Sequence, residues 1–338
     1  MSAMGPLVIE TTDMHTGGEP VRIVTAGYPS ISGATILAKR RHAREHLDHL
    51  RRFLVFEPRG HADMYGVIPV EPDHSDADLA VLFMHNEGYS TMCGHAVIAL
   101  ARWAVDTGRV PLRAPESSVA IQCPCGLVRA RVLVEDGQAG DVFFESVPAF
   151  AFALDAELKV SGLGRVAVDV GYGGAFYALV PAARVGLDVR RSAVRDLVDG
   201  AAAITEAGRS QLRLDHPDAP DLAFLYGTIL TDGADAWVEA PTVNICVFAD
   251  REVDRSPTGS GVTARLAVQH ARGQIRVGQS RRFQSVTGAV FTGRVLRTAR
   301  AREHDAVVVE VGGRAHYTGT ARFTLEPGDK LGEGFLLR

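Results

Sequence analysis

The sequence predicts a two-lobed α/β protein that arose by duplication of one half. The stretches around residues 93–108 and 258–273 repeat each other at one constant offset (258 − 93 = 165), which aligns Cys93 with Thr258, Gly94 with Gly259 and Gly108 with Gly273. In each half, many strand-like runs surround one helix-like run. A chain of 338 residues is long enough for two domains that each bury a core.

In the first half, apolar and polar residues alternate over 7–12 and 21–26 with a glycine turn between them, which predicts a hairpin. Leucines at helical spacing predict one helix over 38–53, with a basic, histidine-rich outer face toward solvent. The first repeat predicts a helix over 94–106. Further strands are expected at 65–70, 79–84, 119–123, 127–134 and 141–145.

The second half is expected to begin near Pro148, where the chain crosses between lobes. A helix is predicted over 192–209 and a loop over 215–221. The glycine-rich residues 171–177 lack the order of a phosphate loop or a dinucleotide fingerprint, so they indicate a turn that approaches the ligand closely. Strands are expected at 223–230, 236–239, 243–248, 286–297, 305–311, 314–325 and 334–337.

Composition places the chain with globular proteins, because 46% of its residues are hydrophobic and 22% are charged. No apolar run approaches the roughly 18 residues of a membrane span. A net charge of −4 gives no broad basic surface, so neither nucleic acid nor a membrane is an expected partner. The N-terminus shows no secretory signal and four cysteines make no disulfide framework, which together favour a cytoplasmic protein.

Each repeat places a small polar turn directly before an apolar helix. A side chain there lies beside unpaired backbone N–H groups and the positive end of the helix dipole. The thiol of Cys93 is therefore expected to have a pKa below the free value of about 8.5, and the same N–H groups can hold a carboxylate. Two such turns would present one side chain on each side of a small anion, and at one of them that side chain is Thr258.

The two turns resemble the active-site motifs of the proline racemase family. The residues that carry the resemblance are Met92-Cys-Gly-His95 and Asp254-Arg-Ser-Pro-x-Gly-Ser-Gly261, supported by the segments 13–20, 57–66, 87–91 and 169–177. Racemases and 4-hydroxyproline epimerases of this family have Cys in both motifs. The subgroup with Thr in the second motif resembles dehydratases of trans-3-hydroxy-L-proline.

The resemblance implies a diaminopimelate-epimerase-like fold, in which each of two pseudo-symmetric lobes curls a sheet around a central helix. It places residues 1–148 and about 328–338 in a first lobe that carries Cys93, and residues 149–327 in a second lobe that carries Thr258. The site is expected in the cleft between the lobes, without a metal or a cofactor. The partner is a small hydroxyproline-type imino acid, and a homodimer is one assembly that this allows.

By resemblance, Cys93 removes the Cα proton of the substrate, while His95 and Asp254 contact its ring nitrogen. Backbone N–H groups of Gly94, Gly259 and Ser260 would hold the carboxylate, and Thr258 would hydrogen-bond the substrate or a water. When the 3-hydroxyl is trans to the carboxylate, the Cα hydrogen and that hydroxyl lie on one face of the ring. One acid–base group therefore suffices for syn elimination, and the enamine product tautomerises to Δ1-pyrroline-2-carboxylate.

Two other functions stay open from the sequence. A racemase or epimerase of proline or 4-hydroxyproline would need another group to act from the face of Thr258. A ligand-binding or thiol-redox protein without turnover is suggested by Cys123-Pro-Cys125. The same Cys-x-Cys pair, and His61 with Asp63, are weak candidates for metal ligands because neither has a second cluster at ligand spacing.

Overall fold

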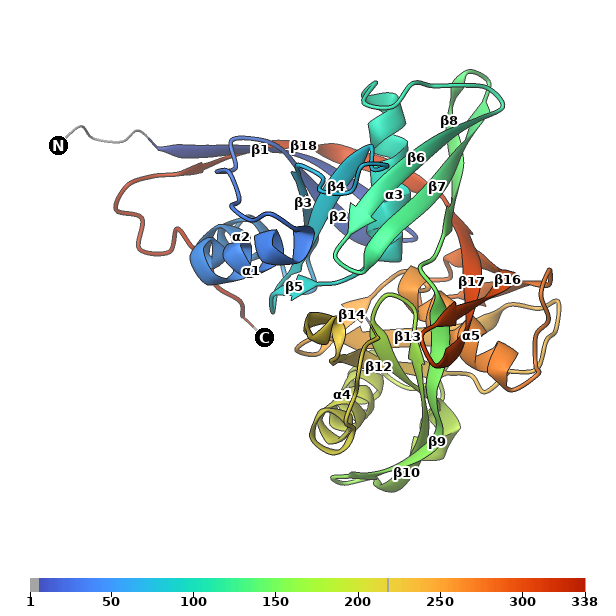
Figure 1. Cartoon of the computed structure of the whole chain (residues 1–338). Helices are drawn as coiled ribbons and strands as arrows, with labels where there is room; N and C mark the ends of the chain where they lie inside the picture. The colour runs from blue at the N-terminus through green and yellow to red at the C-terminus, as the bar shows by residue number, and fades with distance from the viewer. Residues whose placement is uncertain (1–5, 218, 338) are drawn as a thin grey trace.

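The computed structural model describes residues 6–217 and 219–337, which form two lobes of similar construction (Figure 1). In each lobe, strands wrap around one buried helix. These central helices are α3 (Gly94–Asp106) and α5 (Gly259–Ala271), each of 13 residues. Both are buried on nearly every face, as expected for a helix that is enclosed by a sheet, although α5 also buries polar side chains such as Arg265. The predicted fold class is confirmed.

The sheet of the first lobe follows the order β1–β2–β3–β4–β6–β7–β8 around α3. The short strand β5 (Tyr89–Ser90) pairs with β4 and leads into α3. The strands of this sheet are β1 (Leu7–Thr16), β2 (Glu19–Ala26), β3 (Tyr65–Val70), β4 (Leu79–His85), β6 (Glu116–Cys123), β7 (Gly126–Glu135) and β8 (Gln138–Glu145).

The sheet of the second lobe closes on itself around α5 in the order β9–β10–β11–β12–β13–β15–β16–β17, with β17 pairing back to β9. The short strand β14 (Glu252–Asp254) pairs with β13 and leads into α5. The strands are β9 (Ala149–Val160), β10 (Gly164–Tyr172), β11 (Phe176–Pro181), β12 (Leu225–Thr231), β13 (Thr242–Phe248), β15 (Ser280–Gln284), β16 (Val290–Ala301) and β17 (His304–Gly313).

The duplication seen in the sequence extends to the topology. Parallel pairs join β2 to β3 and β4 to β6 in the first lobe, and β11 to β12 and β13 to β15 in the second. The helices that connect the first parallel pair of each lobe are also equivalent. They are α1 (Ile36–His46) with α2 (Asp48–Val55), and α4 (Val194–Gln211), which η1 (Ala182–Val185) precedes and η2 (Pro220–Leu222) follows.

The last strand returns to the first lobe. Strand β18 (Ala315–Leu325) pairs with β1 along its length, whereas β17 pairs with both β8 and β9. Figure 1 shows β18 beside β1, across the molecule from β9 and β10. We therefore propose that the chain returns to the first lobe near Ala315, which is earlier than the expected boundary at about residue 328.

Several local predictions were wrong. The expected single helix over 38–53 breaks at Leu47, and its basic residues do not all face solvent. Arg51 is buried and donates to the carbonyl of His85 at 2.7 Å, and Lys39 donates to that of Glu71 at 2.6 Å. Residues 236–239 form an irregular loop, and 334–337 contribute only a bridge between Phe335 and Glu57.

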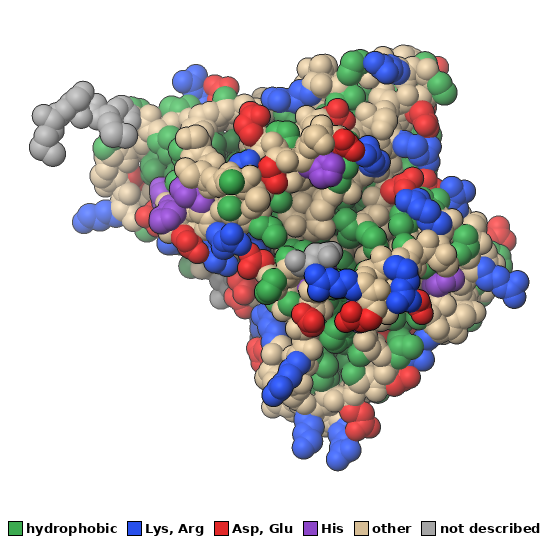
Figure 2. Space-filling view, in the orientation of Figure 1, with side chains coloured by type: hydrophobic (Ala, Val, Ile, Leu, Met, Phe, Trp, Pro, Cys, Tyr) green, Lys and Arg blue, Asp and Glu red, His purple; other side chains and the backbone are tan. Residues whose placement is uncertain are grey.

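Charged side chains of both signs are interspersed over the face shown in Figure 2 and form no broad basic area there. Among the described residues, none of the helices combines the length and the apolar composition that crossing a membrane requires.

Candidate active site

The two central helices begin face to face at the junction of the lobes. Cys93 is the N-cap of α3 and Thr258 is the N-cap of α5. The helices touch through glycine, because a Cβ built on Gly94 would lie 2.5 Å from the Cα of Gly259. Unpaired N–H groups from both lobes therefore converge on one point, where they favour an anion.

A cavity of about 10 Å³ lies at this junction. It is lined by all seven residues predicted for the site, together with residues that were not predicted: Cys93, Gly94, His95, Asp254, Thr258, Gly259 and Ser260, and Tyr65, Met92, Tyr177, Tyr226, Cys246 and Phe248. A space of this size holds about one water molecule. The lobes or the lining side chains must therefore move before a five-membered ring can enter.

Cys93 faces an imidazole. Its Sγ lies 3.0 Å from Nδ1 of His95, and Nε2 of the same ring lies 3.2 Å from the carbonyl oxygen of Pro20. Because the carbonyl can only accept, Nε2 carries the hydrogen, and Nδ1 presents its lone pair to the thiol. The thiol and the imidazole are therefore arranged as a proton donor and its acceptor.

The expectation of a lowered thiol pKa was wrong for this closed cavity. Burial raises the pKa of Cys93 well above its ordinary value, and the charges of Asp254 and Glu19 add to the rise. The backbone N–H of Ala96 and the hydroxyl of Tyr65 act in the opposite direction but do not outweigh burial. Burial also lowers the pKa of His95 to about 3, so the Cys93–His95 pair is neutral in the closed site.

Two buried carboxyl groups lie on the other side of the thiol. Asp254 ends β14, accepts a hydrogen bond from the Ser256 N–H at 2.8 Å, and has a pKa that burial raises to about 6. Glu19 accepts from the N–H of Arg255 at 2.7 Å, while its Oε1 is buried and has no hydrogen-bond partner in the described chain. Burial and the neighbouring charge of Asp254 raise the pKa of Glu19 as well.

Thr258 adopts a conformation that is rare for its residue type. Its φ is 65°, in the left-handed region that a β-branched side chain disfavours. Its Oγ1 is buried, and among the described residues it makes no well-formed hydrogen bond. Strain of this kind persists where the surrounding structure imposes it, and it is frequent at ligand sites.

The glycine-rich segment 171–177 passes close to the start of α5, and its expected approach to a ligand stays a prediction. A Cβ on Gly173 would lie 2.2 Å from the carbonyl oxygen of Ser260. Tyr177, which follows the turn, holds the Ser260 hydroxyl at 2.7 Å, so only the backbone N–H of Ser260 is left for a ligand. The quoted segment contained Tyr177 but gave no signal that its hydroxyl supports the site.

Neither weak metal candidate forms a site. Cys123 pairs with Gly126 across a tight turn that contains Cys125, and His61 and Asp63 lie in a loop rather than on one face of a strand. Among the described residues, no three His, Cys, Asp or Glu side chains gather as metal ligands would.

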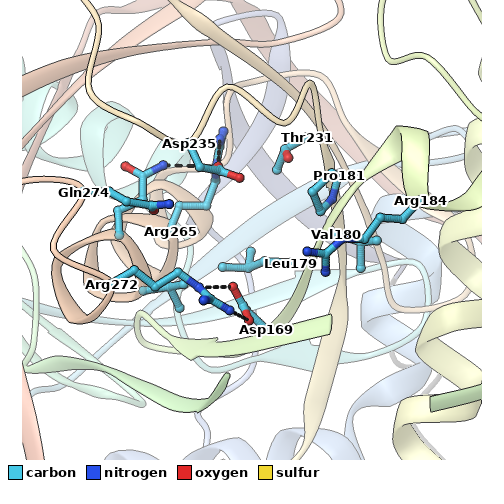
Figure 3. A pocket seen from close by; sticks show the side chains of 12 residues that line it. Asp169, Leu179, Val180, Pro181, Arg184, Thr231, Asp235, Arg265, Arg272 and Gln274 are labelled. Atoms are coloured by element: carbon cyan, nitrogen blue, oxygen red, sulfur yellow. Dashed lines mark hydrogen bonds and ion pairs between the residues drawn. The ribbon is translucent and has the colours of Figure 1, made fainter. Parts of the chain in front are cut away.

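A separate cavity of about 150 Å³ lies in the second lobe (Figure 3). Two of its arginines are paired with its acidic groups, Arg272 with Asp169 at 2.6 Å and Arg265 with Asp235 at 3.2 Å, while Arg184 donates to the carbonyl of Ala167 at 2.9 Å. None of its lining residues is a cysteine or stands at the start of α3 or α5. This cavity therefore contains none of the thiol groups of the candidate site.

Comparison with known proteins agrees with this geometry. A model of the proline racemase family matches residues 11–336. The chain is 59% identical to human trans-3-hydroxy-L-proline dehydratase, covering 99% of this chain and 96% of that protein. It is 44% identical to a 3-hydroxyproline 2-epimerase of Burkholderia multivorans, covering 98% of each.

A solved structure has the same fold over the whole chain. It is a hydroxyproline epimerase from Agrobacterium vitis with bound trans-4-hydroxy-L-proline, 28% identical, with a TM-score of 0.92 and coverage of 99% of this chain and 96% of that one. The match of the family model over nearly the full length, the high identities, and the paired helix starts lead to one conclusion: this chain belongs to the proline racemase family.

Proposed function

We propose that this protein is a cofactor-independent hydro-lyase that converts trans-3-hydroxy-L-proline into Δ1-pyrroline-2-carboxylate. The observation that carries the proposal is the pairing of one thiol, Cys93, with one alcohol, Thr258, at the two facing helix starts. An alcohol is too weak an acid or base to exchange a Cα proton. Chemistry from the Cys93 face alone suffices for elimination and does not suffice for inversion.

Proton removal begins from the neutral Cys93–His95 pair. The thiol proton passes to Nδ1 of His95 over the 3.0 Å contact, which leaves a thiolate facing the substrate. The substrate carboxylate is held by the N–H groups of Gly94, Gly259 and Ser260 at the two helix starts, where they also stabilise its enolate character as the Cα proton leaves. The thiolate takes that proton and becomes a thiol again.

Loss of the hydroxyl completes the elimination on the same face of the ring. As the bond between C3 and oxygen breaks, protonated His95 gives its Nδ1 proton to the departing oxygen, which leaves as water. Cys93 and His95 return to their starting protonation states, so one substrate yields one enamine and one water. The enamine then tautomerises to the cyclic imine without a further protein group.

The remaining predicted contacts fit this scheme. A buried carboxylate at Asp254 suits the secondary ammonium of the substrate ring, and His95 also contacts that nitrogen in the mechanism implied by the resemblance. The strained Thr258 presents a hydroxyl without a well-formed partner, and it would hydrogen-bond the substrate or a water. The cytoplasmic location and a homodimer stay predictions.

An epimerase is the second candidate, and one residue favours it. Cys246 of β13 lines the same cavity from the second lobe and is a thiol other than Cys93. Burial and the charge of Asp254 raise the pKa of Cys246, and the described chain places no imidazole within hydrogen-bond distance of its sulfur. Cys246 therefore lacks the proton acceptor that Cys93 has, so elimination is the better supported reaction.

The test is production of the cyclic imine from trans-3-hydroxy-L-proline, followed by its reaction with o-aminobenzaldehyde. The cis-3-hydroxy isomer is the matched control, because its hydroxyl and Cα hydrogen lie on opposite faces of the ring. We expect imine from the trans isomer only. Cys93→Ser should lower turnover by about 10²- to 10⁴-fold, as expected for loss of an acid–base group; a fully active variant would overturn the assignment of Cys93.

A further inference from the structure

A larger cavity lies between the lobes, next to the active site. It has a volume of about 330 Å³ and receives Arg40 and Arg44 from α1, His85 from β4, Arg209 from α4, and Phe224 and Tyr226 from the start of β12 and the loop before it. We call this cavity the vestibule. Tyr226 lines both the vestibule and the active-site cavity, so a single side chain belongs to both spaces.

Two of the three vestibule arginines have no carboxylate partner in the described chain, whereas Arg44 pairs with Glu45 at 3.1 Å. Arg40 is only 7% exposed, donates to the carbonyl of Tyr89, and has an Nε without a hydrogen-bond partner in the described chain. Arg209 donates only to carbonyl oxygens, at 3.2 Å to Leu225 and 3.4 Å to Ala249. Neither guanidinium forms an ion pair among the described residues.

Two acidic side chains, Glu87 and Asp221, also line the vestibule. Asp221 pairs with Arg41 at 2.6 Å. A buried guanidinium with a free N–H and no ionic partner is costly unless a ligand anion satisfies it. A small carboxylate has the charge and the paired acceptors that arginine binds.

Tyr226 forms the wall between the two cavities. It is 6% exposed, its ring stacks on Phe248 at 5.2 Å between centroids, and its hydroxyl has no well-formed hydrogen bond. The site behind it, at about 10 Å³, cannot admit a substrate as it stands. A displacement of this one side chain would join a space of about 330 Å³ to the space beside Cys93.

We propose that the vestibule is a carboxylate-binding antechamber, in which Arg40, Arg44 and Arg209 collect small monocarboxylates and pass them across Tyr226 to Cys93. The identity of the natural ligand as a hydroxyproline rests on the proposed function. The capture of anions does not, and it can be measured without turnover.

The experiment compares two reagents that alkylate Cys93, iodoacetate and its neutral analogue iodoacetamide. The ratio of their rates cancels the reactivity of the thiol itself and reports only the preference for an anion. Arg209→Gln removes one vestibule charge, and Arg195→Gln removes the same charge from an exposed position on the same helix, outside the vestibule. Labelling is followed by mass spectrometry of the peptide that contains Cys93, with Cys93→Ser as the background.

In Arg209→Gln we expect the iodoacetate-to-iodoacetamide ratio to fall by about threefold to tenfold at low ionic strength, within the range that electrostatic steering spans. Added salt should reduce the ratio in the unmodified protein toward that of the variant. The Arg195→Gln control should keep the original ratio. A ratio in Arg209→Gln equal to that of the unmodified protein would overturn the proposal.

A second variant and a kinetic measurement separate this proposal from the proposed function. Arg44→Gln changes an exposed vestibule residue whose one side-chain bond in the described chain is to its neighbour Glu45, so we expect the variant to fold and the ratio to fall again. For trans-3-hydroxy-L-proline, both variants should lower kcat/KM and leave kcat unchanged. A lowered labelling ratio without any imine formation would contradict only the proposed function. Normal turnover with an unchanged ratio would contradict only the carboxylate-binding role of the vestibule.

Discussion

At the residue scale, we propose that the identity of one side chain separates inversion from elimination. Thr258 occupies in the second lobe the place that Cys93 occupies in the first, at the start of a helix of equal length. The cavity between them also receives His95, which serves only the thiol of the first lobe. In the proposed mechanism, the asymmetry of the reaction follows from an asymmetry between two otherwise equivalent turns.

Replacing Thr258 with cysteine should therefore restore a second acid–base group. We expect Thr258→Cys to incorporate solvent deuterium at Cα of L-proline with inversion, which chiral chromatography and mass spectrometry detect. Thr258→Ser is the matched control, because it keeps the hydroxyl and should show no inversion. Absence of deuterium exchange in a folded Thr258→Cys protein would mean that the two turns do not lie on opposite faces of the bound proline ring.

Asp254 should set an acid limit to activity. Its pKa is raised to about 6 by burial, so it is protonated below that pH and can no longer hold the cationic ring nitrogen. We expect kcat/KM to fall as the pH drops through about 6. In Asp254→Asn, kcat/KM should no longer fall as the pH drops through about 6. At pH 8 this variant should have a kcat/KM lower by about 10- to 100-fold, which corresponds to the loss of one hydrogen bond to a charged group. If kcat/KM of the variant still falls as the pH drops through about 6, that fall comes from the protonation of another group.

The same shift gives a signed prediction for stability. A carboxyl whose folded-state pKa lies above its unfolded value stabilises the fold below the unfolded pKa of about 4, and this contribution is lost as the pH rises through about 6. Asp254→Asn should therefore raise the free energy of unfolding at pH 8, by up to about 3 kcal/mol for a shift of this size. At pH 3, below both pKa values, the two proteins should unfold alike in thermal melts, and a gain that is equal at both pH values would contradict this origin.

Sequence patterns located the polar residues of the two motifs but not the other residues that line or surround the cavity. The seven predicted residues sit in two short motifs whose repetition and position before helices have a direct chemical meaning. Tyr226 and Cys246 come from two consecutive strands of the second lobe and are ordinary strand residues by pattern, whereas Glu19 follows the glycine turn of the first hairpin. The pKa of Cys93 could not be predicted because the closeness of the two lobes sets its desolvation, and no local pattern encodes that distance.

At the scale of elements, the contact between the starts of α3 and α5 requires glycine on both sides. A methyl group on Gly94 would lie 2.5 Å from the Cα of Gly259, so Gly94→Ala must push the two helices apart. We expect a loss of about 1–3 kcal/mol in unfolding free energy, as for overpacked cores, together with loss of turnover.

The control is Gly319→Ala in β18, where an added Cβ meets nothing within 4 Å. It should keep its activity and its unfolding midpoint in thermal melts. Full activity in Gly94→Ala would show that the two helix starts need not converge on the substrate.

The ends of an element could be predicted where the element is fully buried and where glycine residues mark its limits. The helix over 94–106 is confirmed at both ends, because an apolar run begins after Gly94 and Gly108 stops it. The break at Leu47 was not visible, since the leucine spacing continues through it while buried arginines bond loop carbonyls that lie far away in the sequence. The residues 236–239 lie beside β15, but the hydrogen bonds between them in the described chain involve side chains, such as Trp237 donating to the carbonyl of Ser280 at 2.9 Å, and not a strand ladder.

At the scale of the whole molecule, the site exists only where the two lobes meet, so a ligand that bridges both helix starts should stabilise the entire protein. Pyrrole-2-carboxylate, planar at Cα, imitates the enolate-like state and carries the carboxylate. At 100 times its dissociation constant it should add about 2.7 kcal/mol to the free energy of unfolding and protect Cys93 from alkylation. Stabilisation without protection would place the ligand elsewhere, for example in the cavity of Figure 3.

The central claim is that one thiol faces one alcohol, so the protein eliminates water and does not invert. It is tested most directly by offering trans-3-hydroxy-L-proline, trans-4-hydroxy-L-proline and L-proline in D2O, and by following both imine formation and Cα configuration. We predict imine from the first substrate, with no inversion of the other two. Inversion of either one without imine from the first would contradict the account and would show that another group, with Cys246 as the nearest thiol, serves as a base on the face of Thr258.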